Sequence, residues 1–465
     1  MVTISQDTNC GYVVEVTNLR DHKNADRLLV TTFYACDVIV DKTVKVGDIG
    51  LFFPSDVQLN ERFCLVNNLV RRKDENGNEV GGYLDPKKRN VKPIMLRGEK
   101  SEGLYLPISC LSEFTDITKL KPGDTISVVN GEHICQKYIP ATNPNAAGGN
   151  KSNTSQPRRM KIAEMCPTFR EHVDTEQLVF HADAFHAGDF VEVTLKMHGT
   201  SQRTGYLPVV KTKKQTLLEK LLHRPAKTYS EYDYVTGTRR VVIQAGEEGV
   251  HKGGFYESDD WRMAVSDRFR GQLMKGETVY YEIVGFQGHG GAPIMGEVAN
   301  SKVKNKEFSR MYGDTTVFSY GCDPSGELDW KDPDKAPCCE CYIYRMTMTN
   351  EDGRVIEYPP DYVRYRASQM GMKSVMVLDQ LILTEEDANL DSLVARITPY
   401  IEGADPIGKS HTREGVVLRI VNRPSFTAYK HKSMYFKILE GIMKDESTAP
   451  DMEEAQEVQE GGDEA

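Results

Sequence analysis

The 465-residue sequence lacks both long apolar runs and a recognisable secretory leader. No stretch approaches the roughly 18–20 apolar residues that a membrane-spanning helix requires. The opening string, MVTISQDTNCGYVVEV, has neither the basic start nor the apolar centre of a signal peptide. We therefore expect no membrane association and a cytoplasmic location, or the host cytoplasm if the source is a virus.

The sequence also lacks the cysteine spacing of a disulfide framework or of a paired zinc site. Its 10 cysteines are scattered, apart from one short-spaced group at Cys322, Cys338, Cys339 and Cys341. A zinc site normally adds a second CxxC pair or two nearby histidines, and neither follows this group. We interpret the group as free thiols beside a loop, as expected in a reducing compartment.

An excess of positive charge is absent, since the formal net charge is −10. Residues 445–465 contain nine acidic residues and no basic one. Without them, the formal net charge of residues 1–444 is −1. Basic clusters remain in this larger part, at residues 71–72, 87–89, 158–159, 211–214 and 302–306. Such clusters can follow a phosphate backbone, although scattered surface charge explains any single cluster equally well.

The composition changes along the chain and predicts an α+β protein with two domains. Residues 1–135 contain short β-rich runs broken by Gly, Asp, Asn and Pro, which favours a small OB-like five-stranded barrel. Residues 136–162 are rich in Pro, Asn, Gly and Ser and read as a flexible linker. Residues 163–443 mix strands with helices, and residues 444–465 form an acidic tail expected to be disordered.

Two helices are expected in the larger domain. One begins at Ser258 as N-cap, has an apolar stripe from Trp261 to Leu273, and ends at Gly276. The other runs from Thr384 to near Gly403. Strands outnumber these helices without a strand–helix alternation, so antiparallel sheets are predicted.

Lys196 is the residue that most clearly indicates chemistry. In the run VEVTLK (191–196), the valines and Leu195 share one face of a strand, and Glu192, Thr194 and Lys196 share the other. The lysine thus ends a strand on its polar face, ahead of Gly199 in a KxxG turn. A lysine amine is nucleophilic when deprotonated, and burial or cationic neighbours favour that state. A surface lysine before a turn is the alternative for KxxG alone.

Four strings in order resemble the motifs of covalent nucleotidyltransferases. KMHGTSQR (196–203) resembles motif I of RNA ligases, and YYEIVG (280–285), REGVV (413–417) and YKHK (429–432) resemble motifs III, IV and V. FREHVDTEQL (169–178) resembles the segment before motif I in ATP-dependent RNA ligases of the Deinococcus and Naegleria type, which carry an N-terminal OB domain. MLRG (95–98) and SEGL (101–104) resemble the end of that barrel, and HKNADRL (22–28) resembles OB-fold tRNA-binding domains.

The resemblance implies an ATP-grasp-like antiparallel-sheet nucleotidyltransferase domain that seals RNA ends through a lysyl–AMP intermediate. Lys196 would carry AMP, and Glu282 would contact the ribose or metal-bound water. Glu414 would bind a metal or its waters, so both carboxylates are candidate ligands for Mg²⁺ or Mn²⁺. Lys430 and Lys432 share one strand face, from which both can reach phosphate oxygens.

The resemblance also implies an ATP site and RNA partners. The RNA would be a nicked duplex or free ends, including tRNA, and a monomer is expected. Arg203 would hold the ribose or an RNA phosphate, and an aromatic side chain would stack on adenine. The predicted nucleotide-binding residues are Thr194, Leu195, Gly199, Arg203 and Tyr344, with Phe318 as the alternative to Tyr344.

Two departures from the family pattern stand out. Many relatives have Asp where this chain has His198, so contacts made by that Asp do not transfer. Residues 288–341 separate motif III widely from the string that contains Tyr344.

Three alternatives remain from sequence. A DNA ligase or an mRNA-capping guanylyltransferase uses the same lysine chemistry, but both usually place the OB domain after the catalytic one. A non-catalytic tRNA- or RNA-binding protein is the third alternative, although Lys196, Glu282, Glu414 and Lys430 are all retained.

Overall fold

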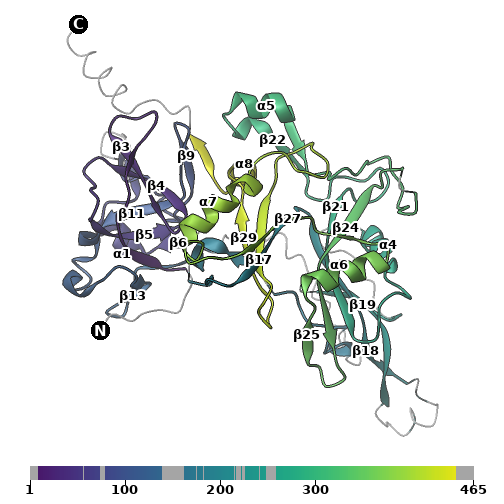
Figure 1. Ribbon diagram of the computed structural model, residues 1–465. Helices are drawn as coiled ribbons and strands as arrows, with labels where there is room; N and C mark the ends of the chain where they lie inside the picture. Colours follow the sequence, from purple (N-terminus) through teal and green to yellow (C-terminus); the bar gives the residue numbers. More distant parts are fainter. Residues whose placement is uncertain are drawn as a thin grey trace.

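The computed structural model describes residues 9–446, except 56, 74–78, 139–161, 174, 182, 214, 216–220, 222–225, 240, 248–257 and 333. Most of the expected linker and all of the tail beyond 446 therefore lie outside the described residues. The architecture is mixed α+β and rich in sheet (Figure 1). In Figure 1 the N-terminal strands, purple to blue, lie at one end, and the sheet that contains β18 and β21 lies at the other.

Short strands dominate the N-terminal part. They are β1 (Gly11–Glu15), β2 (Arg20–Asp21), β3 (Leu28–Phe33), β4 (Cys36–Asp41), β5 (Ile49–Pro54), β6 (Val57–Leu59), β7 (Arg71–Lys73), β8 (Glu79–Gly81), β9 (Ile94–Leu96), β10 (Glu99–Ser101), β11 (Gly103–Pro107), β12 (Thr125–Ile126), β13 (Val128–Val129), β14 (Glu132–His133) and β15 (Cys135–Lys137). Helix α1 (Glu61–Val66), which the sequence did not indicate, packs Phe63 against Phe53 in the core of this domain.

The expected barrel is not seen as a closed ring. Within the described part of the chain, β11, β5, β1 and β12 form one four-stranded sheet, and β2, β3 and β4 form a separate three-stranded sheet. The tight β3–β4 turn places Tyr34 and Ala35 at positive φ, 49° and 62°. This turn directs the hairpin toward the C-terminal domain, where the Ala35 amide donates to the Asp391 carboxylate.

The C-terminal domain contains two main antiparallel sheets. The first has the order β16-β29-β28-β17-β27, in which only β16 pairs in parallel; the second has the order β20-β19-β18-β21-β24-β25, with β26 paired to β24. Their strands are β16 (Glu176–Gln177), β17 (Phe190–Leu195), β18 (Thr200–Thr212), β19 (Thr228–Thr238), β20 (Val242–Ala245), β21 (Glu277–Gly285), β24 (Cys339–Thr349), β25 (Val355–Glu357), β26 (Lys373–Ser374), β27 (Val377–Ile382), β28 (Gly415–Ile420) and β29 (Thr427–Lys432). A small ribbon is formed by β22 (Glu297–Ala299) and β23 (Thr315–Val317).

Helices cover the sheets and join the segments between them. They are α2 (Ile162–Met165), α4 (Asp260–Asp267), α5 (Lys306–Tyr312), α6 (Pro360–Gln369), α7 (Leu390–Ile401) and α8 (Met434–Leu439). The predicted helix exists as α4, but its N-cap is Asp259 rather than Ser258, whose hydroxyl accepts from the Asp260 amide. The helix ends at Asp267, short of the predicted Gly276, and Gly271 beyond it has φ 77°. The predicted second helix is α7, which starts later than Thr384 because the Asn389 side chain caps its first turn.

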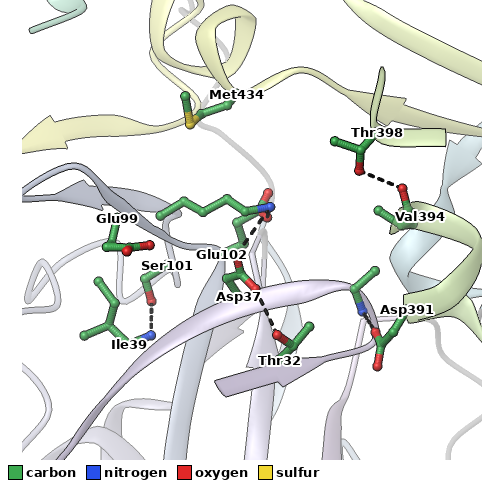
Figure 2. Close-up of polar contacts among 12 residues, drawn as sticks. Thr32, Asp37, Ile39, Glu99, Ser101, Glu102, Asp391, Val394, Thr398 and Met434 are labelled. Atoms are coloured by element: carbon green, nitrogen blue, oxygen red, sulfur yellow. Dashed lines mark hydrogen bonds and ion pairs between the residues drawn. The ribbon is translucent and has the colours of Figure 1, made fainter. Parts of the chain in front are cut away.

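The two domains join through a strand, β30 (Lys444–Glu446), at a position that the sequence had assigned to the acidic tail. β30 pairs in parallel with β9, so residues from the end of the C-terminal domain extend the β9–β10 hairpin. Beside it, Lys437 Nζ on α8 lies 2.5 Å from Glu102 Oε1, and Lys100 Nζ lies 3.0 Å from Glu102 Oε2. Figure 2 shows Glu102 and, further along the same boundary, Asp391.

The Glu102 ion pair should stabilise this boundary. Its side chain is 7% exposed, and Lys437 and Lys100 hold its pKa well below the usual range against the effect of burial. Glu102→Ala leaves Lys437 near the interior without its partner, so the free energy of unfolding should fall by about 3 kcal/mol. Urea unfolding at neutral pH measures this loss, with the exposed Glu113→Ala as control. A loss no larger than that of the control would contradict a stabilising ion pair.

Candidate active site

Lys196 follows the last residue of β17 and meets the start of β28 at the junction of the two sheets. Its amide donates to the Gly415 carbonyl at 3.0 Å, and its Nζ lies 2.7 Å from Glu414 Oε1. The Lys196 side chain is 22% exposed, whereas that of Glu414 is 2% exposed. The amine is therefore reachable from solvent while the carboxylate that fixes it is buried.

Two glycines allow the backbones around Lys196 to approach closely. A Cβ on Gly199 would lie 2.2 Å from the Ile283 carbonyl oxygen, so only glycine lets this turn lie against β21. A Cβ on Gly415 would lie 2.1 Å from the His431 carbonyl oxygen, and Gly415 has φ 140°. These two glycines of the motif strings therefore set the distance between Lys196 and both neighbouring strands.

Glu414 is the charged centre of the cluster. Besides Lys196, it faces Lys432 Nζ at 3.8 Å and His198 Nδ1 at 3.8 Å. Burial alone would raise the pKa of Glu414, but Lys196, His198 and Lys432 outweigh it and hold the pKa below the ordinary value. Glu414 is thus a carboxylate at neutral pH, and its Oε2 is buried without a hydrogen bond among the described residues.

Glu282 lies on β21, opposite Ser201 of β18, and the charge of Glu414 acts on it. It is half-buried. Burial raises its pKa to about 7, with a further contribution from the charge of Glu414, while Lys196 acts in the opposite direction. Carboxylate oxygens are the ligands that Mg²⁺ and Mn²⁺ prefer, so Glu282 and Glu414 stay the predicted metal ligands.

Lys430 and Lys432 occupy alternate positions of β29, as the strand pattern predicts. Both are half-buried, and Lys432 is the nearer to Glu414. Burial, with Lys196 and Lys432 nearby, lowers the pKa of Lys430 to about 8. His431 between them is directed away from these lysines, toward Lys437, Glu102 and Lys100, and burial lowers its pKa to about 3. The N-terminal domain thus packs behind the strand that carries the two lysines.

Tyr344, of the two aromatic candidates, is the one that lines a cavity. It does so with Thr194, Val417 and other residues of β17, β24 and β28, and its hydroxyl is 2.8 Å from Ser201 Oγ. Phe318 instead packs into a core, edge-on to His198. Leu195 is buried, and its amide donates to the Met376 carbonyl.

Arg203, predicted to hold the ribose or an RNA phosphate, contacts the protein's own backbone. Its side chain is 1% exposed, and its guanidinium donates to the carbonyls of Thr238 and Phe169. The guanidinium also lies 4.2 Å from the centre of the Phe169 ring. These contacts connect β18 with the end of β19 and with the segment before β17.

The cysteine group does not form a metal site in the described residues, where no cluster of three His, Cys, Asp or Glu side chains has suitable geometry. Cys322, Cys338, Cys339 and Cys341 are all buried free thiols. No helix in the part of the chain that the structure covers is long and apolar enough for a membrane span.

The sequence did not predict the contacts that surround His198. Phe318 and Phe436 flank its ring at 4.6 and 4.7 Å, Glu440 Oε1 lies 3.5 Å from Nε2, and the Tyr320 hydroxyl accepts its amide at 2.7 Å. The sequence offered Phe318 only as an alternative aromatic for adenine, and no motif marks Tyr320, Phe436 or Glu440. Phe318 and Tyr320 belong to residues 288–341, which separate motif III from the string that contains Tyr344.

Comparisons with known proteins identify the fold. No family model matches the sequence, and no curated protein matches it either. Among solved structures, a point variant of Naegleria gruberi RNA ligase with ATP and manganese aligns with a TM-score of 0.50 at 15% identity, over 93% of this chain and 98% of that chain. The same ligase with pyrophosphate aligns with a TM-score of 0.48 at 16% identity, over 92% and 98%. The first of these alignments shows that the chain shares the fold of this RNA ligase along nearly its whole length.

The pKa of Glu282 gives a pH-dependent prediction. Its folded pKa of about 7 exceeds the ordinary 4.5, so between these values the folded protein keeps a proton that the unfolded chain releases. Wild-type stability should fall as pH rises through this window, and Glu282→Gln should remove that fall. In thermal unfolding with EDTA and without nucleotide, the stability of the variant relative to wild type should be higher at about pH 8 than at about pH 4.5.

The exposed Glu307→Gln serves as the control, since it should show no such change with pH. A difference between Glu282→Gln and wild type that stays constant across the window would contradict the raised pKa.

Proposed function

We propose that the protein is an ATP-dependent RNA ligase that carries AMP on Lys196 and joins 3′-OH and 5′-phosphate RNA ends, in RNA repair. The observation that carries this proposal is the ion pair of Lys196 with Glu414, with Glu282, Lys430 and Lys432 close enough to act on the same charges. The fold shared with Naegleria gruberi RNA ligase supports it, since structures of that enzyme contain ATP or AMP with manganese. An OB-like role for the N-terminal domain in gripping RNA, a monomeric state and a cytoplasmic location remain predictions.

Lys196 supplies the nucleophile. Its Nζ would attack the α-phosphorus of ATP, forming a P–N bond as the bond to the pyrophosphate oxygen breaks. The amine must lose its proton first, and Glu414 Oε1, at 2.7 Å, is the nearest group to which that proton can be passed or shared. The pair also fixes the direction of Nζ, so that attack requires little rearrangement.

The nucleotide would lie in the cleft between the two sheets. The cavity lined by Thr194, Val417 and Tyr344 lies on the polar face of β17, two residues from Lys196, and the adenine ring would enter there by widening it. Lys430 and Lys432 would neutralise phosphate oxygens. Glu282 and Glu414 would hold Mg²⁺ or Mn²⁺, which lowers the charge repulsion around the phosphorus.

Two further transfers complete the reaction. AMP would pass from Lys196 Nζ to a 5′-phosphate oxygen of RNA, breaking the P–N bond and forming a P–O–P linkage. A 3′-hydroxyl oxygen would then attack the activated phosphorus, releasing AMP and closing the strand. Each step is a displacement at a crowded, negatively charged phosphorus, so the same lysines can act throughout.

Replacement of Lys196 tests the covalent step. Lys196→Ala should abolish labelling by α-³²P-ATP and sealing of 5′-phosphate ends, while joining of pre-adenylylated RNA persists. The exposed Lys213→Ala is the matched control and should label like wild type. Labelling of the Lys196→Ala protein at the wild-type level would reject this lysine as the AMP carrier.

The choice of nucleotide and polynucleotide separates ligation of RNA from the alternatives. We expect labelling from ATP rather than GTP, and sealing of nicks with a ribose 3′-OH faster than all-DNA nicks. Label from GTP would instead favour a capping guanylyltransferase, and equal sealing of all-DNA nicks would favour a DNA ligase. RNA binding without any ATP-dependent label would favour a non-catalytic RNA-binding protein.

A further inference from the structure

Tyr320 joins three segments that the sequence places far apart. Its hydroxyl accepts the amide of His198 at 2.7 Å, inside the KMHG turn that begins at Lys196. Its ring lies edge-on to His411 at 4.6 Å, in the loop that leads to Glu414. The side chain is 2% exposed, so this contact is sheltered from competing water.

The backbone around Tyr320 is fixed against the loop before Glu414. A Cβ on Gly408 would lie 2.7 Å from the Gly321 amide nitrogen, and Ser319 Oγ lies 3.1 Å from Ser410 Oγ. Tyr320 itself has φ 48°, a conformation that a tyrosine adopts only when its surroundings hold it there.

The Tyr320 hydroxyl still has a proton to donate after it accepts the His198 amide. Glu414 Oε2 and Asp405 Oδ2 are buried and have no hydrogen bond among the described residues. Burial raises the pKa of Tyr320 far above its usual value, and the charges of Glu414 and Asp405 raise it further. The hydroxyl is therefore a neutral group in the field of the carboxylate that holds Lys196.

We propose that Tyr320 is a positioning residue for adenylylation, because its hydroxyl fixes the Lys196–Gly199 turn relative to Glu414. This inference rests on the proposed function. Segment 288–341 would thereby contribute to the reaction. Phe318 packs edge-on against the ring of His198, and the Tyr320 hydroxyl accepts the His198 amide, at the position where many relatives have Asp. In this chain, two aromatic side chains, Phe318 and Tyr320, therefore hold the turn in place.

Tyr320→Phe removes one hydroxyl and keeps the ring against His411. We expect the single-turnover rate constant for AMP transfer to Lys196 at saturating ATP to fall roughly tenfold, the effect of one buried hydrogen bond. The KM for ATP should stay within about twofold, since Tyr320 lies behind the turn and away from the adenine cavity. Hydrogen exchange of the peptide covering His198, measured without ATP, should become faster.

Tyr234→Phe is the matched control, because the Tyr234 hydroxyl accepts the Gly271 amide at 2.6 Å in the same domain, outside the Lys196 cluster. It should leave both the rate constant and the exchange at His198 unchanged. Tyr320→Phe with a wild-type rate constant would overturn the inference. Two other results would overturn it as well. One is a decrease only in the reaction amplitude, which reports the fraction of competent molecules; the other is an equal decrease of the rate constant in Tyr234→Phe.

Failure of the proposed function would give a different pattern. In that case the wild-type protein would also form no AMP adduct, and the inference would fall with it. A wild-type adduct together with an unaffected Tyr320→Phe rate would reject the positioning role alone.

Discussion

The contact between Lys196 and the buried carboxylate of Glu414 is the constraint on which the site depends. At 2.7 Å it holds a partly exposed amine against a charge that solvent cannot reach. Neighbouring cations keep Glu414 ionised in spite of its burial, so the amine always has a partner in the free protein. Two glycines make this geometry accessible, since side chains at 199 or 415 would collide with the carbonyls of β21 and β29.

The N-terminal domain supports this arrangement from the side of β29 that faces away from Lys430 and Lys432. His431 lies between the two lysines of β29 in sequence but is directed toward Glu102 and Lys437. The pairing of β30 with β9 and the Glu102 ion pair hold the N-terminal domain against α8, which directly follows β29. HKNADRL and MLRG, two strings that resembled OB-domain sequences, also meet here: Asn24 Nδ2 donates to the Arg97 carbonyl at 2.7 Å. The domain boundary is thus part of the support for the strand that carries Lys430 and Lys432.

The sequence predicted the cleft well where local patterns decide the structure. Strand alternation placed Val191, Val193 and Leu195 in the core and Glu192 and Thr194 toward the cavity, as the structure confirms. It failed where tertiary contacts decide. No local pattern predicts that the Arg203 guanidinium donates to the Phe169 carbonyl, and β30 forms only because β9 offers an edge. Tyr320 belongs to a segment without a motif, so only the folded chain reveals its contact with His198.

The central claim is that the Lys196 amine becomes a covalent carrier of adenylate. Peptide mapping by mass spectrometry, after incubation with ATP and Mn²⁺ without RNA, tests it most directly. The account predicts one adenylate on the peptide that contains Lys196, attached at Nζ and removed by added pyrophosphate. An adenylate located on another side chain, or none on a folded protein that binds ATP, would contradict it.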